Sequence, residues 1–339
     1  MDMMTIFALL QDGLSNGAIY SLLALSLVLV FAVTRVILIP QGEFVAYGAL
    51  TAAAMENGNL PATAWMLLAL GLVAATKSAF TQPFRLSSLC VTLVAPAVVI
   101  LCAWFAVRYH AGTIVNELVS VAMVTMIGQY IYRIVFQPLA AASTLTLLLA
   151  AIGVHLAMTG LGLVFFGPGG VQLPPSIDTS ISLGAFTISG QSICVLMSSA
   201  LVSLLLYFGI SRTLVGKALM ATAVNRLGAQ LSGISPTLCG QIAFAMAAFI
   251  GAVSGLLISP LAMIYYDSGF LIGLKGFVAA IMAGLVSFPL AAVAALAIGI
   301  VESFASFTAS AFKEPIVFLS IIPVMLLRSF LTASAAEEE

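Results

Sequence analysis

The sequence predicts an all-α membrane protein, a polytopic helix bundle with about ten spans and a range of roughly eight to eleven. Of its 339 residues, 62% are hydrophobic and only 7% are charged, whereas a soluble domain carries about 25% charged residues. Apolar stretches of roughly 20 residues, the length that crosses a bilayer, recur along the chain. A formal charge of −1 excludes nucleic-acid binding through a basic surface, and dispersed cysteines exclude a disulfide scaffold.

The expected helices occupy the long intervals between ionisable residues, divided where Gly and Pro interrupt them. We predict helices over 14–34, 42–55, 62–76, 88–108, 113–133, 143–167, 189–210, 237–259, 271–287, 289–310 and 314–331. The segment 42–55 is short for a complete crossing. No positive region precedes the first apolar stretch, which is also too long for a signal-peptide core, so we expect the first helix to be retained.

The charge distribution predicts the orientation of the bundle. The connection 211–236 holds the densest cluster of positive charge in the chain, and the positive-inside rule therefore places it in the cytoplasm. Propagating this orientation puts the N-terminus outside and the C-terminus in the cytoplasm. The positive residues expected on the cytoplasmic side are Arg35, Lys77, Arg85, Arg133, Arg212, Lys217, Arg226 and Arg328, while Arg108, Lys275 and Lys313 lie outside or embedded. We expect one transmembrane domain over 1–332 and an acidic tail at 333–339.

The cytoplasmic connection 211–236 has its own periodicity, which predicts two short amphipathic helices with a break near Asn225. Gly233 and then Pro236 end the second helix. The apolar positions that carry the periodicity are Leu214, Ala218, Leu219, Ala221, Leu227 and Leu231. Such a segment could be a simple connector, or a knob that fits a groove on a partner protein.

The same connection resembles a known family at Arg212, Gly216, Lys217, Ala218, Ala221, Asn225, Ala229, Leu231 and Gly233. These residues are similar to the cytoplasmic loop of the permease subunits of branched-chain amino acid ABC importers. Three further stretches resemble that family in the expected order: 13–25 with Gly42-Glu43-Phe44, 136–139 with the helix start at 146–153, and 269–289 with 299–303. Arg226 departs from the family, which usually has proline there. The region 60–114 looks longer than in a typical member and is a possible insertion.

The resemblance implies an inner-membrane, multi-pass permease subunit of a bacterial ABC importer. In that family the loop forms a coupling helix in a cleft of the ATPase, so the implied partners are two cytoplasmic ATP-binding subunits and a second permease subunit, as a heterodimer. A periplasmic or lipid-anchored binding protein would deliver the substrate, and ATP would be used by the partners, with no cofactor on this chain. The implied cargo is branched-chain or other small amino acids, or related small polar solutes.

Four embedded or interfacial charged residues are candidate functional residues, each with a structural alternative. Glu43 stands at a helix start, where its carboxylate could cap free backbone N–H groups, contact substrate or take part in a gating rearrangement. Lys275 and Glu302 border a long uncharged interval. They could form a polar anchor between helices or line a pathway, because ionisable groups at membrane depth commonly pair or face a cavity. Asp267 beside two tyrosines could anchor the outer interface or dock an external partner.

The sequence favours structural roles for several other residues. His155 is alone on an apolar segment, where a hydrogen-bonded packing role is more common than a ligand role. Gly-rich 167–170 is typical of a periplasmic turn rather than a nucleotide loop. No His, Cys or carboxylate group has the spacing of a metal site, and no nucleophile triad is evident. Small residues in the last third suit close helix packing in lipid, or a seam against a second permease subunit.

Two classes of transporter remain. The first class is the permease subunit of an ABC importer. The chain lacks the ATP-binding sequence G-x-x-x-x-G-K-[ST], so in this class partner subunits would hydrolyse ATP and the chain itself would not be an enzyme. The alternative is an ion-coupled secondary transporter of small solutes, which predicts acidic coupling groups at the midplane. The candidate acids Glu43, Glu117 and Glu302 are scattered along the chain, which favours the ABC permease.

Overall fold

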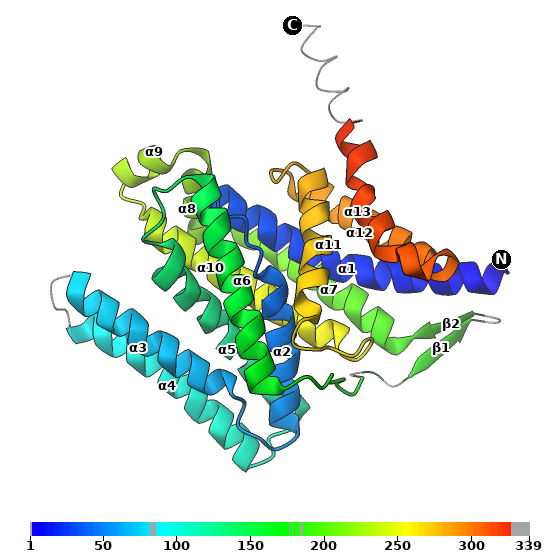
Figure 1. The fold of residues 1–339 in the computed structure, drawn as a ribbon, viewed down its shortest axis with the longest axis horizontal. Helices are drawn as coiled ribbons and strands as arrows, with labels where there is room; N and C mark the ends of the chain where they lie inside the picture. The colour runs from blue at the N-terminus through cyan, green and yellow to red at the C-terminus, as the bar shows by residue number, and fades with distance from the viewer. Residues whose placement is uncertain (1, 82–85, 176, 178, 184–185, 327–339) are drawn as a thin grey trace, which may run out of the picture. The chain divides into compact units, whose positions relative to one another are not determined.

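The computed structural model describes residues 2–81, 86–175, 177, 179–183 and 186–326, and helices dominate it (Figure 1). The first helices are α1 (Met3–Thr34), α2 (Gln41–Glu56), α3 (Thr63–Thr81), α4 (Leu86–Arg108) and α5 (Thr113–Ile131), which continues as the π-helix η1 (Tyr132–Phe136). They are followed by α6 (Thr144–Phe166), the strands β1 (Ser180–Leu183) and β2 (Phe186–Ser189), and α7 (Gly190–Arg212). The chain ends with α8 (Leu214–Val224), α9 (Arg226–Leu231), α10 (Pro236–Ile258), α11 (Ser268–Met282), α12 (Phe288–Thr308), the 3-10 turn η2 (Ser310–Phe312) and α13 (Lys313–Leu319).

The predicted helices are confirmed except at the end of the chain, although two ranges differ from the structure. Each expected segment from 14–34 to 289–310 overlaps a helix, but α1 begins at Met3 rather than residue 14, and α11 ends at Met282 rather than residue 287. The single helix expected over 314–331 is wrong, because α13 ends at Leu319 and a separate helical stretch follows over 321–326. The remainder of that segment, the acidic tail, Arg85 and Arg328 lie outside the described residues. The hairpin of β1 and β2, which pairs Ser180 with Ser189, was not predicted.

Length and apolar composition identify six described helices that could cross a membrane: α1, α5 with η1, α6, α7, α10 and α12. Four shorter apolar helical segments lie at 63–77, 92–108, 214–224 and 268–282. Side-chain caps explain where several helices begin. Ser143, Thr213, Asn225, Ser235 and Ser287 each accept a hydrogen bond from the backbone N–H three residues later, which satisfies a group that the helix leaves free.

The chain forms two compact units. Unit 1 comprises 1–28, 176–203 and 274–339, and unit 2 comprises 29–175 and 204–273. In unit 1, α1 and α12 approach backbone to backbone. A Cβ on Gly13 or Gly17 would collide with the α12 backbone, and one on Gly299 would collide with α1. Small residues allow this close approach, which supplies the van der Waals contact that holds helices together in lipid.

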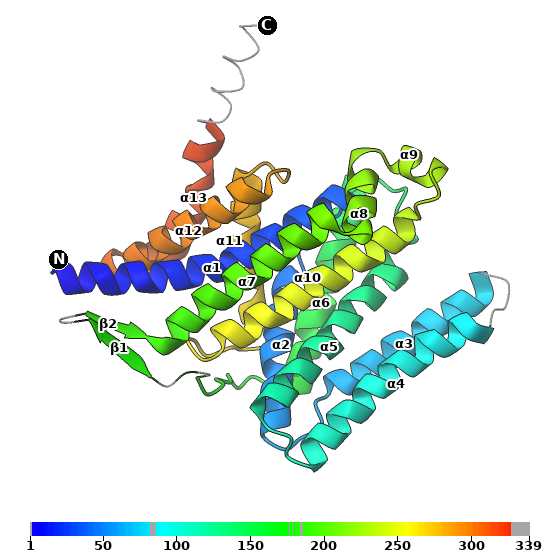
Figure 2. The ribbon, with the colours of Figure 1, turned by 180° about the vertical axis from the view of Figure 1, so that it is seen from behind.

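The centre of unit 2 is the group α2, α5 and α10, in which every helix contacts the other two. Gly48 and Gly255 let α2 and α10 meet at the backbone, and Gly128 lets α5 lie against the Ala248 side chain of α10. The backbone of Gly42 likewise lies directly on that of Gly269. Helices α3 and α4 run side by side and pack against α5, as Figures 1 and 2 both show.

Candidate functional site

The segment between α7 and α10 forms the two short helices that the sequence predicts, α8 and α9. Asn225 separates them with an extended backbone and caps α9 by accepting from the N–H of Gly228 at 2.9 Å. The backbone then leaves α9 through Gly233 at φ +83°, a left-handed conformation that glycine adopts without steric cost. In unit 2, α8 and α9 lie beside the start of α10 (Figure 2).

Apart from Leu219, the residues that the two helices bury are small, and several of their large apolar side chains are exposed. Gly216, Leu219, Thr222 and Ala229 are buried. Of the apolar positions that predicted the amphipathic helices, Leu214 is 84% exposed, Leu227 is 68% exposed and Leu231 is 82% exposed, whereas Leu219 is buried. The periodicity identified the helices but could not say which apolar side chains face the rest of the chain.

Two contacts fix this segment within unit 2. A Cβ on Gly216 would collide with backbone atoms of Gly209 and Ile210, so α8 turns back tightly on the end of α7. The guanidinium of Arg226 donates to the carbonyl of Ala140 at 2.8 Å. Of the other predicted loop residues, Arg212 and Lys217 are exposed, and Ala218 and Ala221 are half-buried.

Glu43 does not make a side-chain cap at the start of α2. Its carboxylate is completely buried, and its Oε1 lies 2.9 Å from Nδ1 of His155 on α6. The imidazole also stacks on Phe270, with the ring centroids 4.7 Å apart. Among the described residues, Oε2 of Glu43 has no hydrogen-bond partner. Within unit 2 the structure therefore brings together Glu43 and His155, which the sequence treated separately.

Lys275 and Glu302 meet inside unit 1. Nζ of Lys275 on α11 lies 2.6 Å from Oε1 of Glu302 on α12 and 3.1 Å from Oε1 of Glu314. The hydroxyl of Tyr20 donates to the other oxygen of Glu302 at 2.6 Å, and Lys313 lies 3.6 Å from Glu302. The pairing balances two positive and two negative charges, which lowers the cost of embedding each one.

Sequence reasoning missed Tyr20 and Glu314 in this cluster. A tyrosine on an apolar helix carries no signal of its partner, and Glu314 lies close to Lys313 in sequence, which suggests only a local pair. Asp267 joins neither cluster of contacts and is exposed between α10 and α11. Within the described ranges, no three His, Cys, Asp or Glu side chains gather as a metal site.

Comparison with known proteins identifies the family. Residues 9–328 match the family described as "Branched-chain amino acid transport system / permease component". The chain is 24% identical to the high-affinity branched-chain amino acid transport system permease protein LivH of Escherichia coli K12, over 93% of this chain and 91% of that protein. It is 27% identical to the corresponding permease protein BraD of Pseudomonas aeruginosa, over 62% of this chain and 70% of that protein.

The chain is 23% identical to the LivH protein of Salmonella typhimurium, over 93% of this chain and 91% of that protein. No solved structure matches. The family match covers almost the whole chain, from within α1 to beyond α13, and agrees with the apolar helices described above. The chain is an integral membrane protein and belongs to the branched-chain amino acid transport system permease family.

Proposed function

We propose that this chain is the transmembrane permease subunit of an ABC importer in the bacterial inner membrane, and that α8 and α9 receive the motion of partner ATPases. The observation that carries the proposal is the set of exposed leucines on the two short helices, Leu214, Leu227 and Leu231. Large exposed apolar side chains on two short helices between α7 and α10 favour a protein groove over water. The nearby Arg212, Lys217 and Arg226 favour the cytoplasmic side.

The proposed assembly has two ATP-binding subunits, a second permease subunit and a periplasmic or lipid-anchored binding protein. Its cargo is branched-chain or other small amino acids, or related small polar solutes. The six long apolar helices cross the bilayer, and shorter ones such as α2, α3, α4 and α11 bring the total to about ten. The N-terminus is outside and the C-terminus is cytoplasmic.

ATP binding and hydrolysis drive transport because the partner subunits contact the two states of the permease differently. ATP-driven closure of the partner subunits favours one position of α8 and α9, and the bundle alternates between inward-facing and outward-facing states because the partners bind those states with different affinity. To transmit the motion of the ATPases, α8 and α9 must be rigidly attached to the bundle. The close packing of Gly216 on the end of α7 and the hydrogen bond from Arg226 to the carbonyl of Ala140 support such an attachment.

The test replaces Leu227 and Leu231 together by glutamate in the assembled importer. Both side chains are exposed, so the chain should still insert and fold, while a charged surface would be excluded from an apolar groove. We expect loss of ATP-driven uptake and loss of the increase in ATP hydrolysis caused by the binding protein. The matched control is Gln230→Glu, which adds charge at an exposed polar position of the same helix and should transport normally.

Uptake at the wild-type rate by the double variant would refute coupling through α9. Transport by the purified chain alone, driven by an ion gradient and without ATP, would refute the importer itself in favour of a secondary transporter.

A further inference from the structure

Two cations are anchored at η1 in unit 2, where the helices α3 and α4 pack against it and α5. Nζ of Lys77, near the end of α3, donates to the carbonyl of Ile134 in η1 at 2.9 Å. The guanidinium of Arg133, the preceding residue of η1, donates to Oγ1 of Thr92 on α4 at 2.9 Å. Both side chains are half-buried, so the two charges are held on the protein rather than extended into solvent.

The position of Lys77 follows from the sequence after η1. In an α-helix the N–H four residues later would donate to the carbonyl of Ile134. That residue is Pro138, which has no N–H, and the N–H of Leu139 donates to Phe136 instead. The ammonium of Lys77 therefore takes the place of a backbone donor, and this fixes its charge one residue away from Arg133.

Arg133 has donors to spare. A guanidinium carries five N–H groups, and the bond to Thr92 is the one hydrogen bond that Arg133 makes with the described residues. The ion pairs among the described residues do not include Arg133. A half-buried guanidinium without a counter-charge attracts anions strongly, and its planar fork fits a phosphate through two parallel hydrogen bonds.

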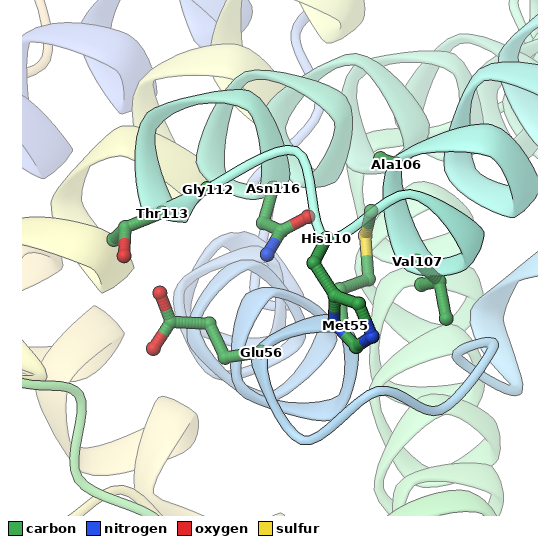
Figure 3. A pocket seen from close by; sticks show the side chains of 8 residues that line it. All are labelled: Met55, Glu56, Ala106, Val107, His110, Gly112, Thr113 and Asn116. Carbon is green, nitrogen blue, oxygen red and sulfur yellow. The ribbon is translucent and has the colours of Figure 1, made fainter.

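The sequence of this region offers no counter-charge nearby. Residues 57–177 contain a single acidic residue, Glu117 near the start of α5. It lies 16 positions before Arg133, which is roughly 24 Å along a helix. Its neighbour Asn116 lies beside Glu56 at a pocket formed by the ends of α2 and α4 and the start of α5 (Figure 3). These acidic groups are therefore at the opposite end of α5 from η1.

The cations border an apolar surface. Val73 lies one helical turn before Lys77 on the same face of α3, and it is 48% exposed, while the adjacent Leu72 is 57% exposed. In the proposed orientation the cytoplasm is on the Lys77 side, so these two side chains face the hydrocarbon of the membrane. A ligand that matches both features carries an anion and a hydrocarbon chain, whereas a free phosphate would match the cations alone.

We propose that Arg133 and Lys77 form a binding site for an anionic phospholipid. The phosphate lies against the guanidinium of Arg133, Lys77 supplies a second positive charge, and an acyl chain follows α3 along Val73 and Leu72. A head group with net negative charge, as in phosphatidylglycerol, is favoured over a zwitterionic one, because the cations repel a positive head-group amine. The site goes beyond the proposed function and rests on it only for the orientation, which places these cations at the cytoplasmic leaflet.

The test measures lipid binding to the full chain in bilayers with a fluorescent reporter at the proposed acyl-chain position. The two native tryptophans, Trp65 and Trp104, are exposed and are replaced by phenylalanine, while Val73→Trp supplies the reporter. Phosphatidylglycerol or phosphatidylcholine with brominated acyl chains, which quench a nearby indole, is added to phosphatidylcholine bilayers. We expect the quenching to show that phosphatidylglycerol binds roughly tenfold more strongly than phosphatidylcholine.

Charge variants locate the preference. Arg133→Gln should reduce it to less than about threefold, because glutamine can still donate to Thr92 but carries no charge. Lys77→Gln should reduce it as well, by a smaller factor. The matched controls, Arg108→Gln and Arg35→Gln, remove exposed cations elsewhere in unit 2 and should leave the preference unchanged.

Three results would overturn the proposal. They are equal quenching by the two lipids, a preference that survives both Arg133→Gln and Lys77→Gln, and relief of quenching by millimolar inorganic phosphate, which would identify a site for a soluble anion. The first and third need no charge variant, so they decide the matter even if a variant fails to fold. Neither ATPase nor nucleotide is present, so failure of lipid binding would leave the proposed permease function standing, and ion-driven transport by the purified chain would refute that function without changing the lipid result.

Discussion

Removing one partner of the pair between Lys275 and Glu302 is expected to destabilise the chain as much as removing both. The side chains are 6% and 8% exposed and their charged atoms lie 2.6 Å apart. A buried ion that loses its partner costs about 3–5 kcal/mol. Other contacts moderate the loss, since Glu302 retains the Tyr20 hydroxyl after Lys275→Met and Lys275 retains Glu314 after Glu302→Gln. We therefore expect about 3 kcal/mol for each single variant and roughly the same for the double variant.

The measurement is the free energy of unfolding of the full chain in mixed micelles, followed by circular dichroism as SDS is added. The four proteins form a double-mutant cycle, and the coupling energy should be about 3 kcal/mol. The control is Lys313→Met, which removes a charge 3.6 Å from Glu302 on a side chain that is 34% exposed, and it should cost less than about 1 kcal/mol. A double variant whose loss equals the sum of the two single losses would refute the reasoning, because the two charges would then not depend on each other.

Three further predictions follow from individual contacts. Gly42→Ala should greatly lower the yield of folded chain in size-exclusion chromatography, because its Cβ would collide with the neighbouring backbone, whereas Gly153→Ala has no described atom within 4 Å and should be neutral; equal yields would contradict this. Tyr47→Phe should lower the unfolding free energy by about 1 kcal/mol, since the hydroxyl donates at 2.8 Å to a carbonyl of α6, and an unchanged value would count against that bond. Arg226→Ala should reduce uptake per ATP hydrolysed, because it releases α9 from the Ala140 carbonyl; an unchanged ratio would exclude this attachment from coupling.

The sequence was sufficient for most of the helices and for the family. Long uncharged intervals located the helices, because the bilayer requires apolar length irrespective of the neighbouring helices. The hairpin of β1 and β2 was missed because its serine- and threonine-rich strands lack a long apolar run. The break after Leu319 was also missed, since Ser320 is a weak signal within an apolar stretch.

Long-range partners could not be predicted to the same degree. Lys275 and Glu302 were paired as candidates because both border one uncharged interval. The contact between Glu43 and His155 joins residues 112 positions apart in the sequence. The spacing of hydrophobic residues predicts helices but does not predict which distant side chains meet. The exposure of Leu227 depends on which side of α9 contacts the rest of unit 2, and hydrophobicity alone cannot decide that. The pocket at Asn116 arises from three helix ends that come together only in the folded chain.

The glycine contacts among α2, α5 and α10 have a mechanical consequence. Where backbones touch directly, as at Gly48 and Gly255, or across a single methyl group, as at Gly128, no flexible side chain lies between the helices to absorb a displacement. Close-packed protein interiors are also nearly incompressible. The three helices therefore move together as one rigid group. We therefore expect a displacement applied where α8 meets α10 to reach the first turn of α5, at the other end of the 24 residues Thr113–Phe136.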